Sequence, residues 1–147
     1  MIKSAMLNIH VWKLALAILL FNRHPDPRRV YRLAELSRIA ASIARTDASD
    51  EEARTLAKVA IHESGAREDA TGPLGEKGPF QIMPPGKPTA EVALARVRWS
   101  MEACSDLSLY AGCRRCGACP ALVAALTAYP DGPEPRSPAQ EGVARNP

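Results

Sequence analysis

The spacing of apolar residues along the chain predicts helices, beginning with residues 11–21. Their sequence, VWKLALAILLF, is almost continuously apolar. The run contains Lys13, is shorter than the roughly 20 residues that cross a bilayer, and precedes NRHPDPRR in place of the small residues of a signal-peptide cleavage site. We therefore expect a buried or amphipathic first helix, with membrane contact through this helix as the alternative, and we find no clear signal peptide.

A second helix is expected after the HPDP segment. Asp26 can accept hydrogen bonds from the first backbone N–H groups, and Pro27 is tolerated at the first helical position. Apolar residues then recur every three or four positions and give the helix one apolar face. These residues are Leu33, Leu36, Ala40 and Ile43.

A third helix has signals at both ends. Ser49 and Glu52 form an S-x-x-E capping box, and Gly65 can end the helix after about residue 64. One face of this helix combines three apolar residues with one carboxylate: Ala53, Leu56, Ala60 and Glu63. Arg54 and Lys58 are expected to point outward.

The composition indicates a single, mainly α-helical domain with little or no sheet. The chain has 147 residues, of which 46% are hydrophobic and only 5% are aromatic. One compact core fits this length, and the low content of strand-forming side chains favours helices. We expect one domain over residues 1–129, with N-terminal helices in 1–48. The proline-rich residues 130–147 are expected to form a disordered tail.

The net charge of +3 is concentrated near the N-terminus. Residues 1–46 contain eight Lys and Arg residues and two Asp and Glu residues. This excess suits contact with a polyanion, or it marks a solvated helical face. No basic run is interleaved with aromatic residues, so we expect no nucleic-acid partner.

Glu63 is the candidate catalytic residue. Its position on the apolar face and in the last helical turn predicts a raised pKa, because desolvation and the negative end of the helix dipole both disfavour a carboxylate. A carboxyl group that stays protonated near neutral pH can act as a general acid. The alternative is an exposed glutamate at a frayed helix end.

The segment after Glu63, residues 65–85, is called the glycine loop below. Its glycines at positions 72, 75 and 78 allow positive φ angles and a close approach of backbone to ligand. Gln81 offers amide donors and an acceptor for sugar groups, and three side chains could form an apolar floor. These side chains are Phe80, Ile82 and Met83. The alternative is a surface loop with a core-packed end.

The motifs ESG at residues 63–65 and GPFQIMP at residues 78–84, at this spacing, resemble the catalytic region of lytic transglycosylases of the soluble-type and goose-lysozyme-like superfamily. The resemblance implies a lysozyme-like helical domain with an active-site groove and a catalytic core in residues 49–129. It implies substrate contacts from a set of residues around the motifs. These are Ser64, Gly78, Phe80, Gln81, Ile82 and Met83.

The resemblance also implies the reaction. Glu63 would protonate the β-1,4 glycosidic oxygen between N-acetylmuramic acid and N-acetylglucosamine in peptidoglycan. It would then accept the proton of the muramoyl 6-hydroxyl, so that a 1,6-anhydro ring closes without water. One carboxylate suffices for this route. A hydrolytic lysozyme would need a second carboxylate, for which Asp69 and Glu76 are the nearest candidates.

The family places a tyrosine, in a motif A-Y-N-A-G, where its hydroxyl can hydrogen-bond the catalytic acid. Two segments compete for this role, LSLYAGC with Tyr110 and ALTAYPDG with Tyr129, and neither keeps the Asn. The local sequence pattern A-L-x-A-Y-x-x-G favours Tyr129. The order of elements favours Tyr110, because PALVAALTAY can supply the helix that follows the motif in the family. We therefore favour Tyr110 as the catalytic tyrosine, with Tyr129 as the alternative; either tyrosine could instead be an aromatic residue at the edge of the core.

Four cysteines lie within sixteen residues, between the last two expected helices: Cys104, Cys113, Cys116 and Cys119. They could form a Cys₄ zinc or iron–sulfur site, or two disulfides. A disulfide would brace the segment if the protein works outside the reducing cytosol, and Cys104 with Cys113 is the first choice.

The expected partner is a peptidoglycan glycan strand, and the expected protein is a monomer without cofactor or metal, located in the cell envelope or periplasm or associated with a phage. Two other classes stay open. One is a non-catalytic wall-binding or phage structural module. The other is a Cys₄ metal-binding interaction domain.

Overall fold

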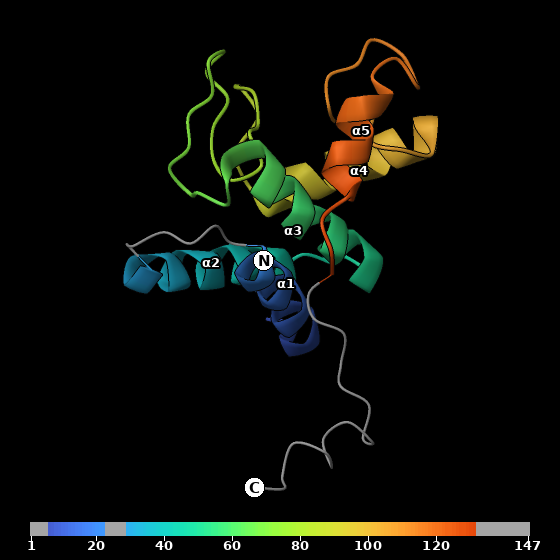
Figure 1. Ribbon diagram of the computed structural model, residues 1–147. Coiled ribbons are helices and arrows are strands. Elements are labelled where there is room, and N and C mark those ends of the chain that lie inside the picture. Colours follow the sequence, from blue (N-terminus) through green and yellow to red (C-terminus); the bar gives the residue numbers. More distant parts are fainter. Residues whose placement is uncertain (1–5, 23–28, 132–147) are drawn as a thin grey trace, which may run out of the picture.

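The computed structural model describes residues 6–22 and 29–131, and of residues 29–31 it describes the backbone alone. This part of the chain is mainly α, as expected, and contains no β-sheet (Figure 1). Two isolated bridges join Thr71 to Lys77 and Lys77 to Ile82. The helices are α1 (Ile9–Phe21), α2 (Arg29–Ala44), α3 (Asp50–Ser64), α4 (Ala90–Cys104) and α5 (Pro120–Thr127).

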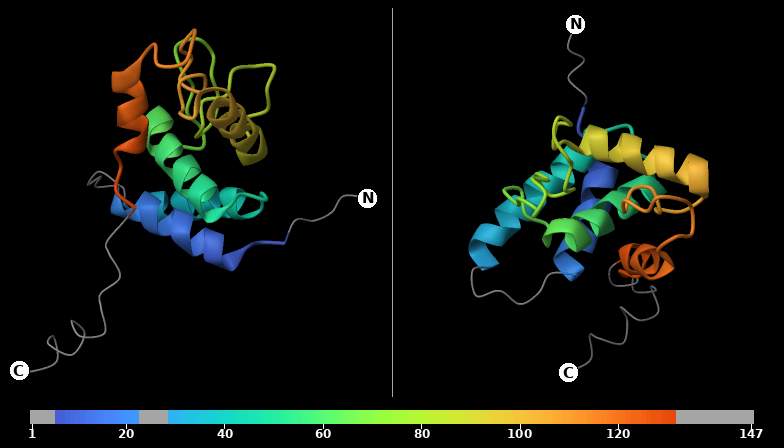
Figure 2. Two further views of the ribbon diagram at one scale, coloured as in Figure 1. Left: turned by 90° about the vertical axis from the view of Figure 1, so that its right-hand side faces the viewer. Right: turned by 90° about the horizontal axis from the view of Figure 1, so that it is seen from above.

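Helix α3 is the centre of the described structure, because it contacts each of the other four helices. Helices α1 and α2 pack together on one side of α3, and α4 and α5 lie on the other (Figures 1 and 2). Six of the fifteen residues of α3 are buried in the common core. They are Ala53, Leu56, Ala57, Val59, Ala60 and Ile61.

Both predicted ends of α3 are confirmed. The Ser49 hydroxyl accepts the N–H of Glu52 at 3.1 Å, and the Glu52 carboxylate accepts the N–H of Ser49 at 2.9 Å. Gly65 follows the last turn with a left-handed φ of +65°. Its N–H and that of Ala66 bond to carbonyls of the last turns of α3. These local interactions place Glu63 in the final turn.

The first helix is amphipathic, one of the two expected forms: Val11 and Ile18 are in the core, and Phe21 is exposed. No helix in the described residues is both long and apolar enough to span a membrane. In α2 the predicted apolar face begins one turn later than expected, because Leu33 is 50% exposed while Leu36 is buried. The proposed caps at residues 26 and 27 and the tail beyond residue 131 lie outside the described residues.

The predicted outward position of Lys58 and Arg54 is wrong. The Lys58 side chain is only 16% exposed, and its ammonium group forms a 2.6 Å ion pair with Asp131. The Arg54 side chain is one-third exposed, and its Nε atom is buried. Helix α5 packs against α3, and the chain that follows it reaches Lys58. Helical periodicity alone does not reveal that a later segment covers this face.

Candidate active site

The C-terminal end of α3 lies between two irregular segments (Figures 1 and 2). One is the glycine loop, and the other is residues 105–119, called the Tyr110 segment below. Glu63 is half-buried at this end of α3. Desolvation raises the pKa of Glu63 above its ordinary value, the charge of Glu76 adds to this effect, and the charge of His62 opposes it. The carboxyl group therefore has the environment of a proton donor.

Ser64 ties the end of α3 to the glycine loop. Its hydroxyl lies 3.0 Å from the carbonyl of Ala60 and 2.8 Å from the carbonyl of Pro79, and it accepts the N–H of Arg67 at 3.1 Å. The single hydroxyl proton is therefore engaged within the protein. Ser64 positions the loop beside Glu63, which differs from the substrate contact expected from the sequence.

The glycine loop is held by short-range backbone bonds. Lys77 and Ile82 exchange two N–H to carbonyl bonds of 3.0 Å, and the N–H of Gly78 donates to Ala70 at 2.9 Å. Gln81 has a φ of +50°, and its side-chain nitrogen donates to the Gly78 carbonyl at 2.8 Å. A non-glycine residue in this region is uncommon. The Gln81 amide thus stabilises the loop from inside, with its nitrogen turned to the backbone.

The structure corrects the expected apolar floor. Phe80 and Ile82 are 1% and 0% exposed and belong to the core, so neither side chain can touch a ligand. Met83 is half-exposed and is the one member of this group with accessible surface.

Gly78 is buried, with a φ of +78°. A Cβ atom at this position would lie 2.9 Å from the Cβ of Pro88. The glycine is therefore required by its own conformation and by packing against Pro88. Gly75, with a φ of +91°, has nothing within 4 Å of its Cβ position. Of the two, only Gly75 presents open space to an approaching ligand.

Tyr110 faces the same end of α3. Its hydroxyl donates to the carbonyl of Phe80 at 2.8 Å, which joins the Tyr110 segment to the glycine loop. Burial raises the pKa of Tyr110, and the charge of Glu63 raises it further, so the phenol stays protonated beside the carboxyl group. Buried Ser100 positions the tyrosine, because its oxygen accepts the N–H groups of Leu109 at 3.1 Å and Tyr110 at 3.3 Å.

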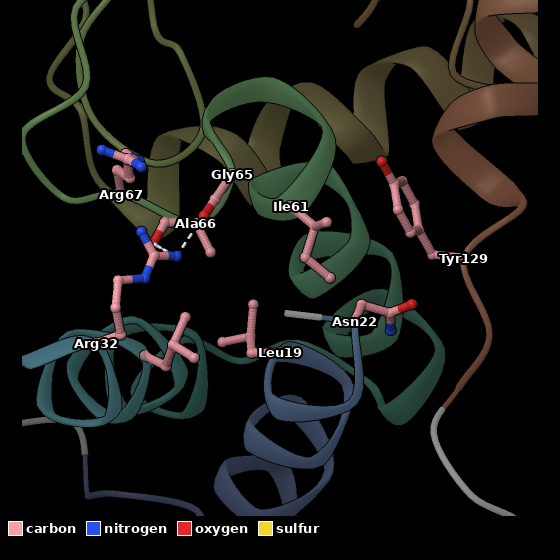
Figure 3. Close-up of a pocket in the computed structure, with 9 residues that line it drawn as sticks. Leu19, Asn22, Arg32, Ile61, Gly65, Ala66, Arg67 and Tyr129 are labelled. Carbon is pink, nitrogen blue, oxygen red and sulfur yellow. Dashed lines mark hydrogen bonds between the residues drawn. The ribbon is translucent and has the colours of Figure 1, made fainter. Parts of the chain in front are cut away.

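Tyr129 lies on the opposite side of a small cavity from Arg32 (Figure 3). Its ring stands edge-on to His62, with 6.3 Å between ring centroids. It lines a cavity of about 140 Å³ together with side chains of α1, α2 and α3. The charge of Glu63 acts on Tyr110, whereas the ring of Tyr129 faces His62. The Tyr110 hydroxyl donates to Phe80, and in the described residues neither tyrosine forms a hydrogen bond with Glu63. This arrangement favours Tyr110 as the tyrosine of the site.

Arg32 supports the site from the far side of this cavity, and sequence reasoning missed it. One Nη atom donates to the carbonyl of Gly65 at 2.6 Å and to that of Ala66 at 3.4 Å (Figure 3). The other lies 3.5 Å from Glu35. Arg32 thereby satisfies carbonyls at the end of α3 with a positive charge. No local pattern could have identified it, because its partners lie 33 and 34 positions later.

The cysteines pair differently from the first choice. The sulfur atoms of Cys104 and Cys116 are at disulfide distance, with a Cα separation of 5.2 Å, and so are those of Cys113 and Cys119, with 6.2 Å. The N–H of Cys113 bonds to the carbonyl of Ser108 at 3.0 Å. In the described part of the chain, no group of His, Cys, Asp or Glu side chains is placed to hold a metal ion.

Comparisons with protein-family models, with curated proteins and with solved structures gave no match to this chain. Any function inferred from the structure therefore rests on the arrangement of the residues around Glu63. A half-buried carboxyl group with a raised pKa lies at the end of α3, and its charge acts on the protonated phenol of Tyr110. Ser64 and Ser100 hold the two neighbouring segments in place. Such a carboxyl group can donate a proton to a leaving oxygen and later accept one.

Proposed function

We propose that this protein is a peptidoglycan lytic transglycosylase with a lysozyme-like fold. In this reaction the β-1,4 bond between N-acetylmuramic acid and N-acetylglucosamine is cleaved without water, and a 1,6-anhydro product forms. The observation that carries the proposal is the desolvated Glu63 carboxyl group at the end of α3, with its raised pKa. The resemblance of the ESG and GPFQIMP motifs supplies the substrate class.

Glu63 performs both proton transfers. In its protonated form it donates to the glycosidic oxygen while the bond to the anomeric carbon of N-acetylmuramic acid breaks. The resulting carboxylate then takes the proton of the 6-hydroxyl on the same sugar, and that oxygen bonds to the anomeric carbon. Tyr110 contributes a neutral phenol beside the carboxyl group, fixed by its bond to the Phe80 carbonyl.

Glu76 supports a hydrolytic alternative. Its charge acts on Glu63, and it is half-buried, whereas Asp69 is exposed. One oxygen of Glu76 accepts the N–H of Leu74 at 3.0 Å, which fixes the carboxylate in the glycine loop. A carboxylate held there could activate a water molecule, and the product would then carry a reducing end.

Mass spectrometry of muropeptides tests the proposal. Purified sacculi are digested with the oxidised wild-type protein and with the Glu63→Gln and Glu76→Gln variants. We expect anhydro ends from the wild type, at least about 10²-fold less product from Glu63→Gln, and retained activity in Glu76→Gln. Circular dichroism and thermal unfolding confirm that each variant is folded.

The product distinguishes the three possibilities. Reducing ends that disappear in Glu76→Gln would establish the hydrolytic route and overturn the anhydro route. Binding to sacculi without any product would identify a non-catalytic wall-binding module. Activity of Glu63→Gln near that of the wild type would remove Glu63 from the chemistry.

A further inference from the structure

An open cavity lies on the Tyr110 segment. It has a volume of about 490 Å³ and is lined by residues between 111 and 119. The lining combines small side chains, the Cys113–Cys119 disulfide, and the two arginines Arg114 and Arg115. The disulfide closes the loop that carries both arginines, so the cavity lining is cross-linked.

The cavity is positively charged. Within residues 104–119 the charged side chains are Asp106, Arg114 and Arg115. Asp106 is engaged in its own turn, where it accepts the N–H of Ser108 at 2.8 Å. Both arginines are exposed, and neither forms an ion pair with a described residue. Two adjacent guanidinium groups without an internal partner favour an anionic ligand, and carboxylates match their fork geometry.

Helix α5 adds to the positive potential. Cys119 lines the cavity and precedes the first residue of α5, and this helix end has no side-chain cap. The partial positive charge of a helix N-terminus attracts anions. The attraction of an anion by the helix N-terminus adds to the larger attraction by the full charges of the two arginines.

The cavity lining begins at the residue that follows Tyr110 in the chain. Ala111 lines the cavity and follows Tyr110, whose hydroxyl bonds to the glycine loop. In peptidoglycan, each N-acetylmuramic acid carries a short peptide stem that bears free carboxylates. A muramic acid bound at Glu63 would therefore project its peptide away from the sugar chain and toward a neighbouring surface of the protein.

We propose that the cavity formed by Arg114, Arg115 and the Cys113–Cys119 disulfide binds the carboxylates of peptidoglycan peptide stems. The small side chains Ala111 and Ala118 leave room for the alanine methyl groups of such a peptide. The inference rests on the proposed function, since it names a second part of the same substrate. It makes the protein selective for glycan strands that still carry peptides.

An NMR titration of the ¹⁵N-labelled, oxidised Glu63→Gln protein tests the inference. The probe is a free stem tetrapeptide that contains alanine, isoglutamate and diaminopimelate and has free carboxylates. The comparison probe is the same peptide with every carboxylate amidated. We expect shifts of amide signals in residues 111–119 with the free peptide, and an affinity lower by about tenfold with the amidated one.

Charge variants test whether peptide binding depends on the arginines of the cavity or only on the positive charge of the protein as a whole. Arg114→Gln/Arg115→Gln should weaken peptide binding by about tenfold, and Arg114→Lys/Arg115→Lys should retain part of the affinity. The matched control, Lys13→Gln/Arg45→Gln, removes two exposed charges that lie on α1 and just after α2, and it should bind like the parent. Thermal unfolding checks the fold of each variant.

Three results would overturn the inference: equal affinity for the amidated peptide, equal affinity of Arg114→Gln/Arg115→Gln, or binding of poly(glycerol phosphate) at residues 111–119 in place of the peptide. The last result would assign the cavity to a phosphate polymer. The probes contain no glycosidic bond. Peptide binding in a protein that cleaves no sacculi would therefore refute the proposed function alone, and cleavage without cavity-dependent binding would refute this inference alone.

Discussion

Alanine substitutions at Gly75 and Gly78 test how the glycine loop is built. Both glycines have positive φ angles, +91° and +78°, in a loop that connects α3 to α4. An added Cβ meets nothing within 4 Å at Gly75. At Gly78 the same atom would lie 2.9 Å from the Cβ and 3.4 Å from the carbonyl oxygen of Pro88. The two variants therefore share the conformational cost and differ in the steric one.

The expected magnitudes follow from this difference. An alanine at positive φ costs roughly 1–2 kcal/mol, and the loss of glycine freedom in the unfolded chain returns about 0.4–1 kcal/mol. Gly75→Ala should therefore lower the free energy of unfolding by about 1 kcal/mol. Gly78→Ala should add an overpacking cost of about 1–3 kcal/mol, because Pro88 is rigid and cannot move its Cβ independently of the backbone.

Urea unfolding, followed by circular dichroism, measures both variants under oxidising conditions. We expect Gly78→Ala to be less stable than Gly75→Ala by at least about 1 kcal/mol. A double-mutant cycle with Pro88→Gly should recover part of this difference, because that substitution removes the opposing Cβ. Equal stability of the two alanine variants would refute the packing of Gly78 against Pro88.

Three further predictions concern charges and hydrogen bonds around α3. Burial raises the pKa of Glu63 above its ordinary 4.5, so the folded protein loses stability as the pH rises through the raised pKa. Glu63→Gln should therefore have a higher melting temperature than the wild type at about pH 8. The same difference in melting temperature below pH 4.5 would contradict this prediction. Ser100→Ala should lower the free energy of unfolding by about 1–3 kcal/mol in urea titrations, because it leaves two partly buried N–H groups without their acceptor. The hydrogen bond from Arg98 lowers the pKa of Glu52 to about 2, so stability present above pH 4.5 is lost toward pH 2; acid titration of Arg98→Gln should show a smaller loss in this window.

Helix α3 was predictable because its determinants are local. The Ser49 and Glu52 capping box and the left-handed Gly65 involve residues within a few positions of each other, and the structure contains both. The half-buried position of Glu63 follows from helical periodicity once these ends are fixed. Local signals therefore predict where Glu63 lies in the helix, and its choice as the candidate acid also used the spacing between ESG and GPFQIMP.

The surroundings of the acid depend on contacts between distant residues, and these could not be predicted. Arg32 reaches carbonyls 33 and 34 positions later, and Tyr110 reaches a carbonyl 30 positions earlier. The burial of Phe80 and Ile82 also depends on how the glycine loop folds over the core. Each of these contacts requires the path of the intervening chain, which no spacing of residue types specifies.

The disulfides should stabilise the segment that carries Tyr110. In the chain-entropy description, closing loops with sequence separations of 12 and 6 stabilises the fold by about 2–3 kcal/mol each. Reduction should therefore lower the melting temperature. It should also lower activity, because the Tyr110 hydroxyl would lose its fixed position at the Phe80 carbonyl. Thiol titration of the oxidised, denatured protein should find no free thiol, and four free thiols with bound zinc would overturn the disulfides.

Tryptic digestion without reduction tests the pairing itself, because trypsin cuts after Arg114 and Arg115, between the second and third cysteines. Pairing of Cys104 with Cys113 would keep each disulfide inside one peptide. The pairing in the structure instead joins the peptide with Cys104 and Cys113 to the peptide with Cys116 and Cys119. A further chymotryptic cut after Tyr110, with fragmentation between Cys116 and Cys119, identifies the partner of each cysteine. Two separate peptides with internal disulfides would refute this connectivity, and the end of α4 would then be linked to Cys113 in place of Cys116.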